Sequence, residues 1–211
     1  MGNWYLVRHG ETAWNRSGQI QGHTDVPLSE YGRLQVRRLA ERLSTCSFSK
    51  IYTSDLSRAL ESAETLAKFG ETSIEADSDL REFSYGTWES MTQREMEIQD
   101  PKGFAERIGG ESYAFATPGG ESTTQVLARV RRFHARAAER HDPSESLLIV
   151  AHGGSIRALL VCLLGLPDTY FWRLHVDNSS LSVVQNHPGG RVLERWNDTG
   201  HLTSLEPRVR E

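Results

Sequence analysis

Two histidines in the sequence stand next to residues that bind anions. Arg8 directly precedes His9, and His152 is followed by Gly153 and Gly154. A guanidinium group binds phosphoryl oxygens through paired hydrogen bonds, and the start of a helix presents backbone N–H groups to an anion. A neutral imidazole can in addition form a covalent bond as a nucleophile. These residue types therefore indicate chemistry on a phosphoryl group.

Short apolar stretches rich in β-forming residues precede these groups. The stretches are residues 3–7, 50–54 and 146–151, which come before Arg8, Arg58 and His152 respectively. We expect each of them to form a buried strand. The carboxyl ends of parallel strands lie along one edge of a sheet, where open α/β folds bind ligands. Both histidines and both arginines should therefore converge at that edge.

Amphipathic patterns between these strands predict helices. They cover residues 29–43, a stripe ending at Ala67 that Ser54 or Asp55 can cap, residues 122–141, and residues 155–164. A weak strand at 73–76 and a hairpin of 180–185 with 191–196 complete the pattern. We predict an α/β fold, a three-layer sandwich with a mostly parallel central sheet flanked by helices.

Several cations fall outside the apolar stripes of these helices. Arg58 lies opposite the stripe of its helix, in the first turn, where it can face solvent or a pocket. On the 122–141 helix we expect exposed, solvated positions for Arg129, Arg131, Arg132, His134 and Arg136.

Two segments lack clear periodicity. Residues 13–28 contain Gly18, Gly22 and Pro27 and are predicted to be a loop that binds something, because long ordered loops in domains are usually functional. Residues 77–120 are interpreted as an irregular lid excursion over the sheet edge, with short helices near 92–99 and 102–107. This interpretation keeps residues 1–211 as a single domain.

The charge composition of the chain limits the kinds of molecule that it is expected to bind. The formal net charge is −4, from 24 Lys and Arg against 28 Asp and Glu, which argues against a nucleic-acid partner. A local cationic pocket in an acidic protein suits a small anion, and we expect a small phosphorylated metabolite. The sequence predicts no oligomeric state.

The cysteines and the apolar runs indicate the cellular compartment in which the protein is expected. Cys46 and Cys162 form no CxxC pair, so a reducing cytoplasm is expected, and Cys162 is expected in the core. The N-terminus carries no charged region followed by a long apolar stretch, so no secretory signal is expected. No apolar run approaches the roughly 18 residues of a membrane span, so we expect no membrane partner.

Several motifs in the same order resemble the histidine phosphatase superfamily, which includes cofactor-dependent phosphoglycerate mutases and many small-metabolite phosphatases. The resemblance extends over residues 4–202 and implies a phosphoglycerate-mutase-like fold. The matching motifs are Arg8-His9-Gly10-Glu11-Thr12, Gln21-Gly22, Asp25 with Pro27-Leu28, Ser54-Asp55-Leu56-Ser57-Arg58-Ala59, Gly119-Gly120-Glu121-Ser122 and Ala151-His152-Gly153-Gly154.

The resemblance implies a role for each matching residue. His9 would be the nucleophile that forms a phosphohistidine, while Arg8, Arg58 and His152 would hold the phosphoryl oxygens. Asn15 and Gln21 match loop positions that also contact phosphate, and Glu82 matches the proton donor. Independently, the flanking arginines should keep His9 neutral, and we expect a backbone carbonyl to fix its tautomer.

Some site assignments leave alternatives open. A general acid needs a pKa near neutrality, so we expect Glu82 to be protonated mainly in the substrate complex; a surface carboxylate is the alternative, since Glu89 lies nearby. The helix opening at Gly153 should point free N–H groups at the phosphate. His201 is a candidate contact to the leaving group, and His23 can edge the pocket; either can equally be an ordinary exposed histidine.

Three functions fit the pattern. A phosphomonoester hydrolase is favoured, because residues 89–120 offer only Arg94, Lys102 and Arg107 as cations, whereas the mutases carry a longer, arginine-rich insertion that excludes water. A phosphoglycerate mutase and, less favoured, a non-catalytic phosphate-binding module are the alternatives. Segments at 177–180 and 197–202 resemble α-ribazole phosphatases, phosphoserine phosphatases and broad-specificity relatives. No metal-ligand spacing is present, so a metal-independent phosphatase without cofactors is expected.

Overall fold

A six-stranded sheet forms the centre of the protein. The computed structural model describes residues 1–68, 70, 72–108 and 114–205. The strand order is β3-β2-β4-β1-β5-β6, with β1 to β4 parallel and β5 antiparallel to both of its neighbours. The strands are β1 (Asn3–Arg8), β2 (Lys50–Thr53), β3 (Ile74–Ala76), β4 (Leu147–Ala151), β5 (Leu181–His187) and β6 (Gly190–Asp198). The predicted mostly parallel sheet and its C-terminal hairpin are confirmed.

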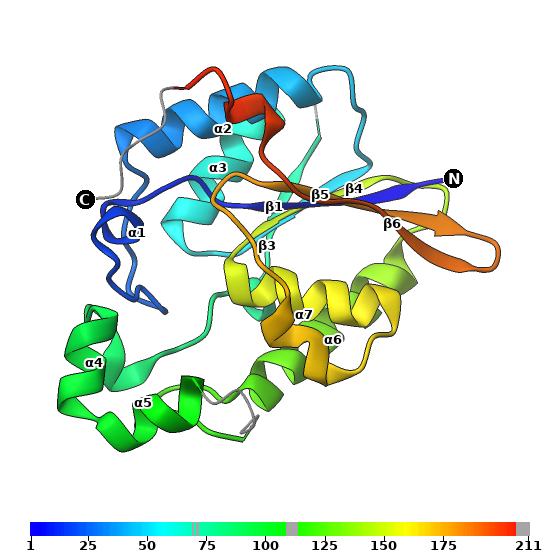
Figure 1. Cartoon of the computed structure of the whole chain (residues 1–211). Coiled ribbons are helices and arrows are strands. Elements are labelled where there is room, and N and C mark those ends of the chain that lie inside the picture. Colours follow the sequence, from blue (N-terminus) through cyan, green and yellow to red (C-terminus); the bar gives the residue numbers. More distant parts are fainter. Residues whose placement is uncertain (69, 71, 109–113, 206–211) are drawn as a thin grey trace.

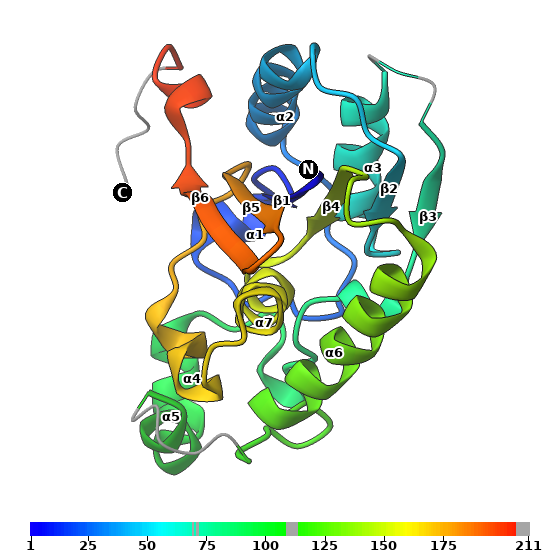
Figure 2. The same ribbon diagram turned by 90° about the vertical axis from the view of Figure 1, so that its right-hand side faces the viewer.

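Helices cover both faces of this sheet. Helices α2 (Glu30–Leu43) and α3 (Ser57–Ala67) pack on one face, and α6 (Thr123–Arg140) and α7 (Gly153–Leu164) pack on the other (Figure 1). The view in Figure 2, turned by 90°, shows the sheet between these two helical layers. The predicted three-layer sandwich is therefore confirmed.

The central strand β4 explains why the sheet is buried on both sides. Leu147 and Ile149 pack in the core cluster formed with α6 and α7, whereas Leu148 and Val150 pack in the cluster formed with α2 and α3. All of β4 is buried, since successive side chains of a strand point to opposite faces. Because both faces of β4 contact apolar layers, its sequence is apolar throughout and does not alternate with polar residues.

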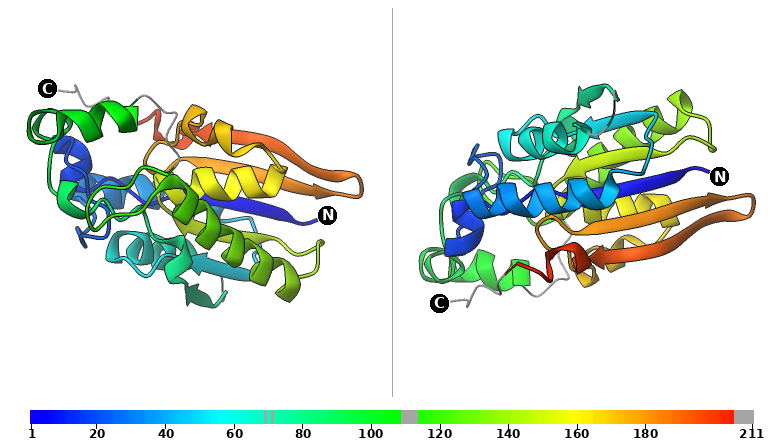
Figure 3. Two further views of the ribbon diagram at one scale, coloured as in Figure 1. Left: turned by 90° about the horizontal axis from the view of Figure 1, so that it is seen from below. Right: turned by 90° about the horizontal axis from the view of Figure 1, so that it is seen from above.

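The register of the parallel strands aligns their carboxyl ends. Arg8 pairs with Ala151, and Thr53 pairs with Val150. Beyond these ends lie α1 (Ala13–Ser17), α4 (Gln93–Gln99) and α5 (Pro101–Ile108), gathered at the end of the molecule opposite the N-terminus (Figure 3). The residues that follow each strand are thereby brought to one edge.

Two local predictions about the residues after β1 and β2 are wrong. Residues 13–17 form helix α1, because Thr12 and Asn15 cap it through mutual side-chain and backbone hydrogen bonds. Neither Ser54 nor Asp55 is the N-cap of α3, which is Leu56 without a side-chain cap bond. Asp55 accepts hydrogen bonds from Arg81 instead, so its carboxylate is not available to the helix.

The prediction that Arg129 is solvated is also wrong. Its side chain is buried, 7% exposed, and donates hydrogen bonds to the carbonyl and carboxylate oxygens described below. The remaining α6 arginines do reach the surface, where Arg131 pairs with Asp168 and Arg136 pairs with Asp77. Burial of Arg129 is possible because all of its charge is compensated locally.

Residues 77–120 contain short helices and, in their described part, no strand. The helices are η1 (Ser78–Leu80), η2 (Gly86–Trp88), α4 and α5. The buried Trp88 packs near Phe104 of α5 and Phe115, which ties the excursion together. Two further short helices, η3 (Asp168–Arg173) and η4 (Gly200–Leu202), were not predicted.

The cysteines are separate from one another. Cys162 packs against the core cluster on the α6–α7 side and Cys46 against the cluster on the opposite side, and both are free. Burial raises the pKa of the Cys162 thiol to about 11, as expected for a packing role. Within the described ranges, none of the helices combines the length and apolar character needed to cross a membrane.

Candidate active site

His9 lies directly after β1 with its imidazole fixed by the main chain. The ring is buried, and its Nδ1 lies 2.7 Å from the carbonyl oxygen of Gly10. A carbonyl only accepts hydrogen bonds, so Nδ1 carries the proton and donates it. In the neutral ring Nε2 then holds a lone pair. The backbone carbonyl expected to set the tautomer is therefore present.

His152, at the end of β4, packs beside His9. Their ring centroids are 5.0 Å apart, and His152 is fully buried. Burial lowers the pKa of His9 well below its usual value, and the charges of Arg58 and Arg8 lower it further. The pKa of His152 is lowered well below its usual value by burial, and then by Arg58, His9 and Arg8. Both rings are consequently neutral at physiological pH.

Gly10 is required by close packing. A Cβ atom there would lie 2.5 Å from the carbonyl oxygen of Gly32, at the start of α2. Its N–H also donates to the hydroxyl of Ser62 on α3. The glycine thus lets α2 approach the chain that carries His9; a left-handed backbone turn is not the reason for it.

The two arginines are held by carbonyl oxygens. Arg58 is completely buried in the first turn of α3 and donates to the carbonyls of Gly22 and Thr24. Arg8 donates to the carbonyl of Val176 at 2.6 Å. Burial is the main factor that lowers the pKa of each guanidinium. Their positions are fixed in advance of any ligand, as preorganised anion binding requires.

These groups meet at a pocket of about 180 Å³. Arg8, His9, Arg58 and Glu82 line it, as the sequence pattern suggested. His152 packs against His9 and is not among the lining residues, and neither of its ring nitrogens has a hydrogen-bond partner among the described residues. The other lining residues are Asn15, Gln19, Ile20, Gln21, Gly22, Phe83, Tyr85, Gly153, Gly154 and Arg157.

The carboxylate of Glu82 binds to the start of α7. Oε1 accepts hydrogen bonds from the N–H groups of Gly154, at 3.0 Å, and Phe83, at 2.9 Å. The Gly154 N–H is therefore not free for phosphate, contrary to expectation, because it holds the carboxylate. The positive end of the helix favours a negative charge at this place. Glu89 lies elsewhere and accepts from the N–H groups of His23, Thr24 and Tyr85.

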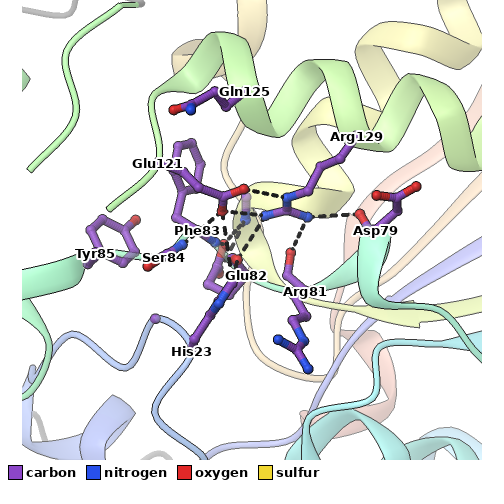
Figure 4. Close-up of polar contacts among 12 residues, drawn as sticks. His23, Asp79, Arg81, Glu82, Phe83, Ser84, Tyr85, Glu121, Gln125 and Arg129 are labelled. Atoms are coloured by element: carbon purple, nitrogen blue, oxygen red, sulfur yellow. Dashed lines mark hydrogen bonds and ion pairs between the residues drawn. The ribbon is translucent and has the colours of Figure 1, made fainter. Parts of the chain in front are cut away.

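A buried ion pair holds the backbone that carries Glu82. The guanidinium of Arg129 bonds both carboxylate oxygens of Glu121, at 2.9 and 3.0 Å. It also donates to the carbonyls of Asp79, Arg81 and Glu82 (Figure 4). Of these five hydrogen bonds from one planar group, the three to carbonyls fix the backbone of residues 79–82.

The other two histidines named from the sequence have different surroundings. His23 is half-buried outside the pocket lining, and its Nε2 lies 2.8 Å from the Glu82 carbonyl oxygen (Figure 4). His201 is outside the lining as well and lies 3.3 Å from Nη1 of Arg42 on α2. The structure thus brings His23 to the backbone of Glu82 and leaves His201 away from the pocket.

Some residues near the pocket were not singled out from the sequence. Arg157 lines it from α7. Its spacing of one helical turn from Gly153 is the feature of the sequence that could have placed it at the pocket. Asn178 donates from its side chain to the His9 carbonyl and to Oδ1 of Asn15. Only the three-dimensional return of residues 176–180 to β1 reveals this contact. Among the described residues, no group of three or more His, Cys, Asp or Glu side chains is placed to hold a metal ion.

The sequence profile of the histidine phosphatase superfamily (branch 1) matches residues 4–199. The chain belongs to this superfamily. It is 32% identical over 197 residues to phosphoserine phosphatase 1 of Hydrogenobacter thermophilus, covering 93% of this chain and 92% of that one. It is 36% identical over 203 residues to the probable phosphoglycerate mutase GpmB of Yersinia enterocolitica, covering 94% of both.

Solved structures of this superfamily share the fold. The mycobacterial glucosyl-3-phosphoglycerate phosphatase, solved with VO3, superposes with a TM-score of 0.85 at 32% identity. The match covers 93% of this chain and 99% of that chain. The phosphoglycerate-mutase-like architecture implied by the resemblance is thereby confirmed.

Proposed function

We propose that this protein is a phosphomonoester hydrolase that acts on a small phosphorylated metabolite through a phosphohistidine at His9. The observation that carries the proposal is the fixed tautomer of His9, which leaves the lone pair on Nε2 in a pocket that Arg8 and Arg58 also line. Phosphatases and a probable mutase among the relatives agree with chemistry on phosphate esters.

In the first step Nε2 of His9 attacks phosphorus, and the bond between phosphorus and the alcohol oxygen breaks. Protonated Glu82 gives its proton to the departing oxygen, so that an alcohol leaves. In the second step Glu82 takes a proton from water, which attacks the phosphohistidine. Phosphate leaves and His9 returns to its starting state.

Several groups would stabilise the transferred phosphoryl group. Its transition state spreads negative charge over three equatorial oxygens. Arg8 and Arg58 supply positive charge, and neutral His152 can donate one hydrogen bond from a ring nitrogen. Asn15 and Gln21, both in the pocket lining, would contact the same oxygens, and the Gly153 amide at the start of α7 is a further candidate.

In this scheme substrate binding favours the protonated form of Glu82. A phosphate dianion beside the carboxylate repels its negative charge, and this repulsion is relieved when the carboxylate takes up a proton. The same carboxylate accepts an N–H bond from Gly154 before substrate arrives. Proton uptake by Glu82 is therefore coupled to phosphate binding in this scheme.

Phosphoglycerate mutase activity is the alternative function. The excursion offers few charges that would close over a phosphoenzyme, since Arg94 and Lys102 are exposed and Arg107 stacks on aromatic rings. Water would reach the phosphohistidine, which favours hydrolysis. A non-catalytic phosphate-binding role is the least favoured, because it would make no use of the His9 tautomer.

The chemistry needs no metal, because two guanidinium groups already neutralise the phosphoryl charge. Activity should therefore survive a chelator. The proposed location is a reducing cytoplasm, and α-ribazole phosphate, phosphoserine and related esters are the substrates to try first. The test is phosphate release from such a panel, with and without chelator, by wild type and His9→Ala. Phosphate release that depends on His9 supports a hydrolase, and isomerisation of phosphoglycerate without phosphate release supports the mutase.

A further inference from the structure

A third guanidinium group lines the pocket beside those of Arg8 and Arg58. Arg157 lies on α7, one helical turn after Gly153, and faces the same pocket as Phe83 and Tyr85. Burial is the main factor that lowers the pKa of Arg8; the carboxylate of Glu82 raises it and the charge of Arg157 lowers it. Both guanidinium groups line the same pocket, so an anion bound there would be attracted by both.

Arg157 lacks a carboxylate partner in the part of the chain that the structure describes. Its buried Nε has no hydrogen-bond acceptor there. The guanidinium carbon lies 5.6 Å from the ring centroid of Trp172, whose face orients the group. The guanidinium group of Arg157 has no carboxylate partner among the described residues and is oriented by Trp172. In this it resembles Arg8 and Arg58 more than the ion-paired surface arginines of α6.

A fourth cation stands behind the aromatic wall of the pocket. Arg107 of α5 has its guanidinium carbon 4.5 Å from the Trp172 centroid and 4.7 Å from the Phe83 centroid. It also lies 5.3 Å from the centroid of Tyr85. The aromatic part of the pocket lining, Phe83 and Tyr85, is therefore accompanied by positive charge.

The balance of charge between the pocket and a phosphomonoester indicates which further substrate group the pocket binds. A phosphomonoester carries close to two negative charges, which Arg8 and Arg58 match. Glu82 is protonated in the proposed substrate complex, so it does not offset Arg157. An additional negative group on the alcohol part of the substrate would offset the charge of Arg157. A single planar guanidinium donates hydrogen bonds to both oxygens of a carboxylate side by side, whereas a second phosphate would need more donors.

We propose that Arg157 binds a carboxylate on the substrate, so that the enzyme prefers phosphomonoesters of small hydroxy acids. The inference rests on the phosphatase activity proposed above and names the substrate class of that same site. The pocket, with a volume of about 180 Å³, has room for a small acid of this kind.

The test compares two substrates with the same three-carbon skeleton, 3-phosphoglycerate and glycerol 3-phosphate. They differ in a carboxylate against a hydroxymethyl group. Wild type should favour 3-phosphoglycerate in kcat/KM by about tenfold or more, as expected for a charge-assisted contact. In Arg157→Gln this ratio should fall by about tenfold, and Arg157→Lys, which keeps the charge but loses the planar fork, should retain part of it.

The matched control is Arg37→Gln, which removes an exposed arginine of α2 outside the pocket lining and should leave both rates and their ratio unchanged. Melting temperatures of all variants check folding. Equal losses on both substrates in Arg157→Gln would make Arg157 a phosphate ligand and overturn the inference. Hydrolysis of nitrophenyl phosphate by wild type without a preference for 3-phosphoglycerate would overturn it too. Failure to hydrolyse any of the three esters contradicts the phosphatase proposal itself.

Discussion

The imidazole rings of His9 and His152 are buried side by side, with centroids 5.0 Å apart and planes inclined by 60°. Neither ring is charged, because burial and the charges of Arg58 and Arg8 lower the pKa of both. A neutral His9 is the form that attacks phosphorus. The same burial makes folding depend on pH.

The free energy of unfolding should decrease as the pH falls below about 6.5, the usual histidine pKa in an unfolded chain. Below that pH the unfolded state binds protons at both positions and the folded state does not, so each ring costs up to about 1.4 kcal/mol per pH unit. Urea unfolding at about pH 7.5 and about pH 5.5 measures the effect. The double variant His9→Asn with His152→Asn should show a smaller pH dependence, and an unchanged dependence would contradict the neutral pair.

Glu82→Gln should slow turnover of alkyl phosphates by about 10²–10⁴-fold, because the amide cannot protonate a poor leaving group. Nitrophenolate leaves without a proton, so the first step with nitrophenyl phosphate should be slowed much less. Burst and steady-state kinetics on both esters measure this difference. Equal losses in the first step for the two esters would remove Glu82 from the role of acid.

Arg129→Met should impair catalysis without contact to the substrate. Removing the guanidinium frees the carbonyls of residues 79, 81 and 82 and leaves Glu121 unpaired, so the Glu82 carboxylate loses its position. We expect kcat on alkyl phosphates to fall by about tenfold to a hundredfold and nitrophenyl phosphate to be affected less, together with a loss of about 3 kcal/mol of stability.

Arg132→Met is the matched control for Arg129. Arg132 is on the same helix and pairs with Asp79 at the exposed surface. Its removal should change stability by less than about 1 kcal/mol and leave the ratio of rates on the two esters unaltered. If Arg129→Met lowered both rates equally, its role would be in stability alone.

Gly154→Ala should displace the Glu82 loop. A Cβ at this position would lie 2.4 Å from Oε1 of Glu82 and 2.6 Å from the ring of Phe83. We expect a loss of about 1–3 kcal/mol of stability and slower turnover of alkyl phosphates. At Gly153 the nearest atom, Oε2 of Glu82, is 3.7 Å from the added Cβ. Gly153→Ala should therefore have the higher melting temperature of the two, and the reverse order would contradict this packing.

The sequence predicted those parts of the molecule that local pattern controls. The strands before Arg8 and His152 are apolar runs, and the helix predicted over residues 122–141 is α6, which Ser122 and Gln125 cap. Because parallel strands share an edge, the convergence of Arg8, His9 and Arg58 followed from topology alone.

What the sequence did not predict depends on partners distant along the chain. Arg129 lies among charged residues on a polar face, yet it is buried because the 79–82 backbone and Glu121 fold over it. Asp55 would cap α3 but for Arg81. Helical periodicity describes one element at a time, so it carries no information on such contacts.

Rapid-quench trapping of the phosphoenzyme tests the central claim most directly. Wild type mixed with a ³²P-labelled phosphomonoester should give a labelled protein whose phosphate is lost in acid and retained in base, with the label on the peptide that contains His9. His9→Ala should give no label. Glu82→Gln should accumulate the label when the ester is nitrophenyl phosphate, because its first step needs no acid while its second step is slowed. Phosphate release by wild type without any such adduct, or label on a residue other than His9, would contradict the account.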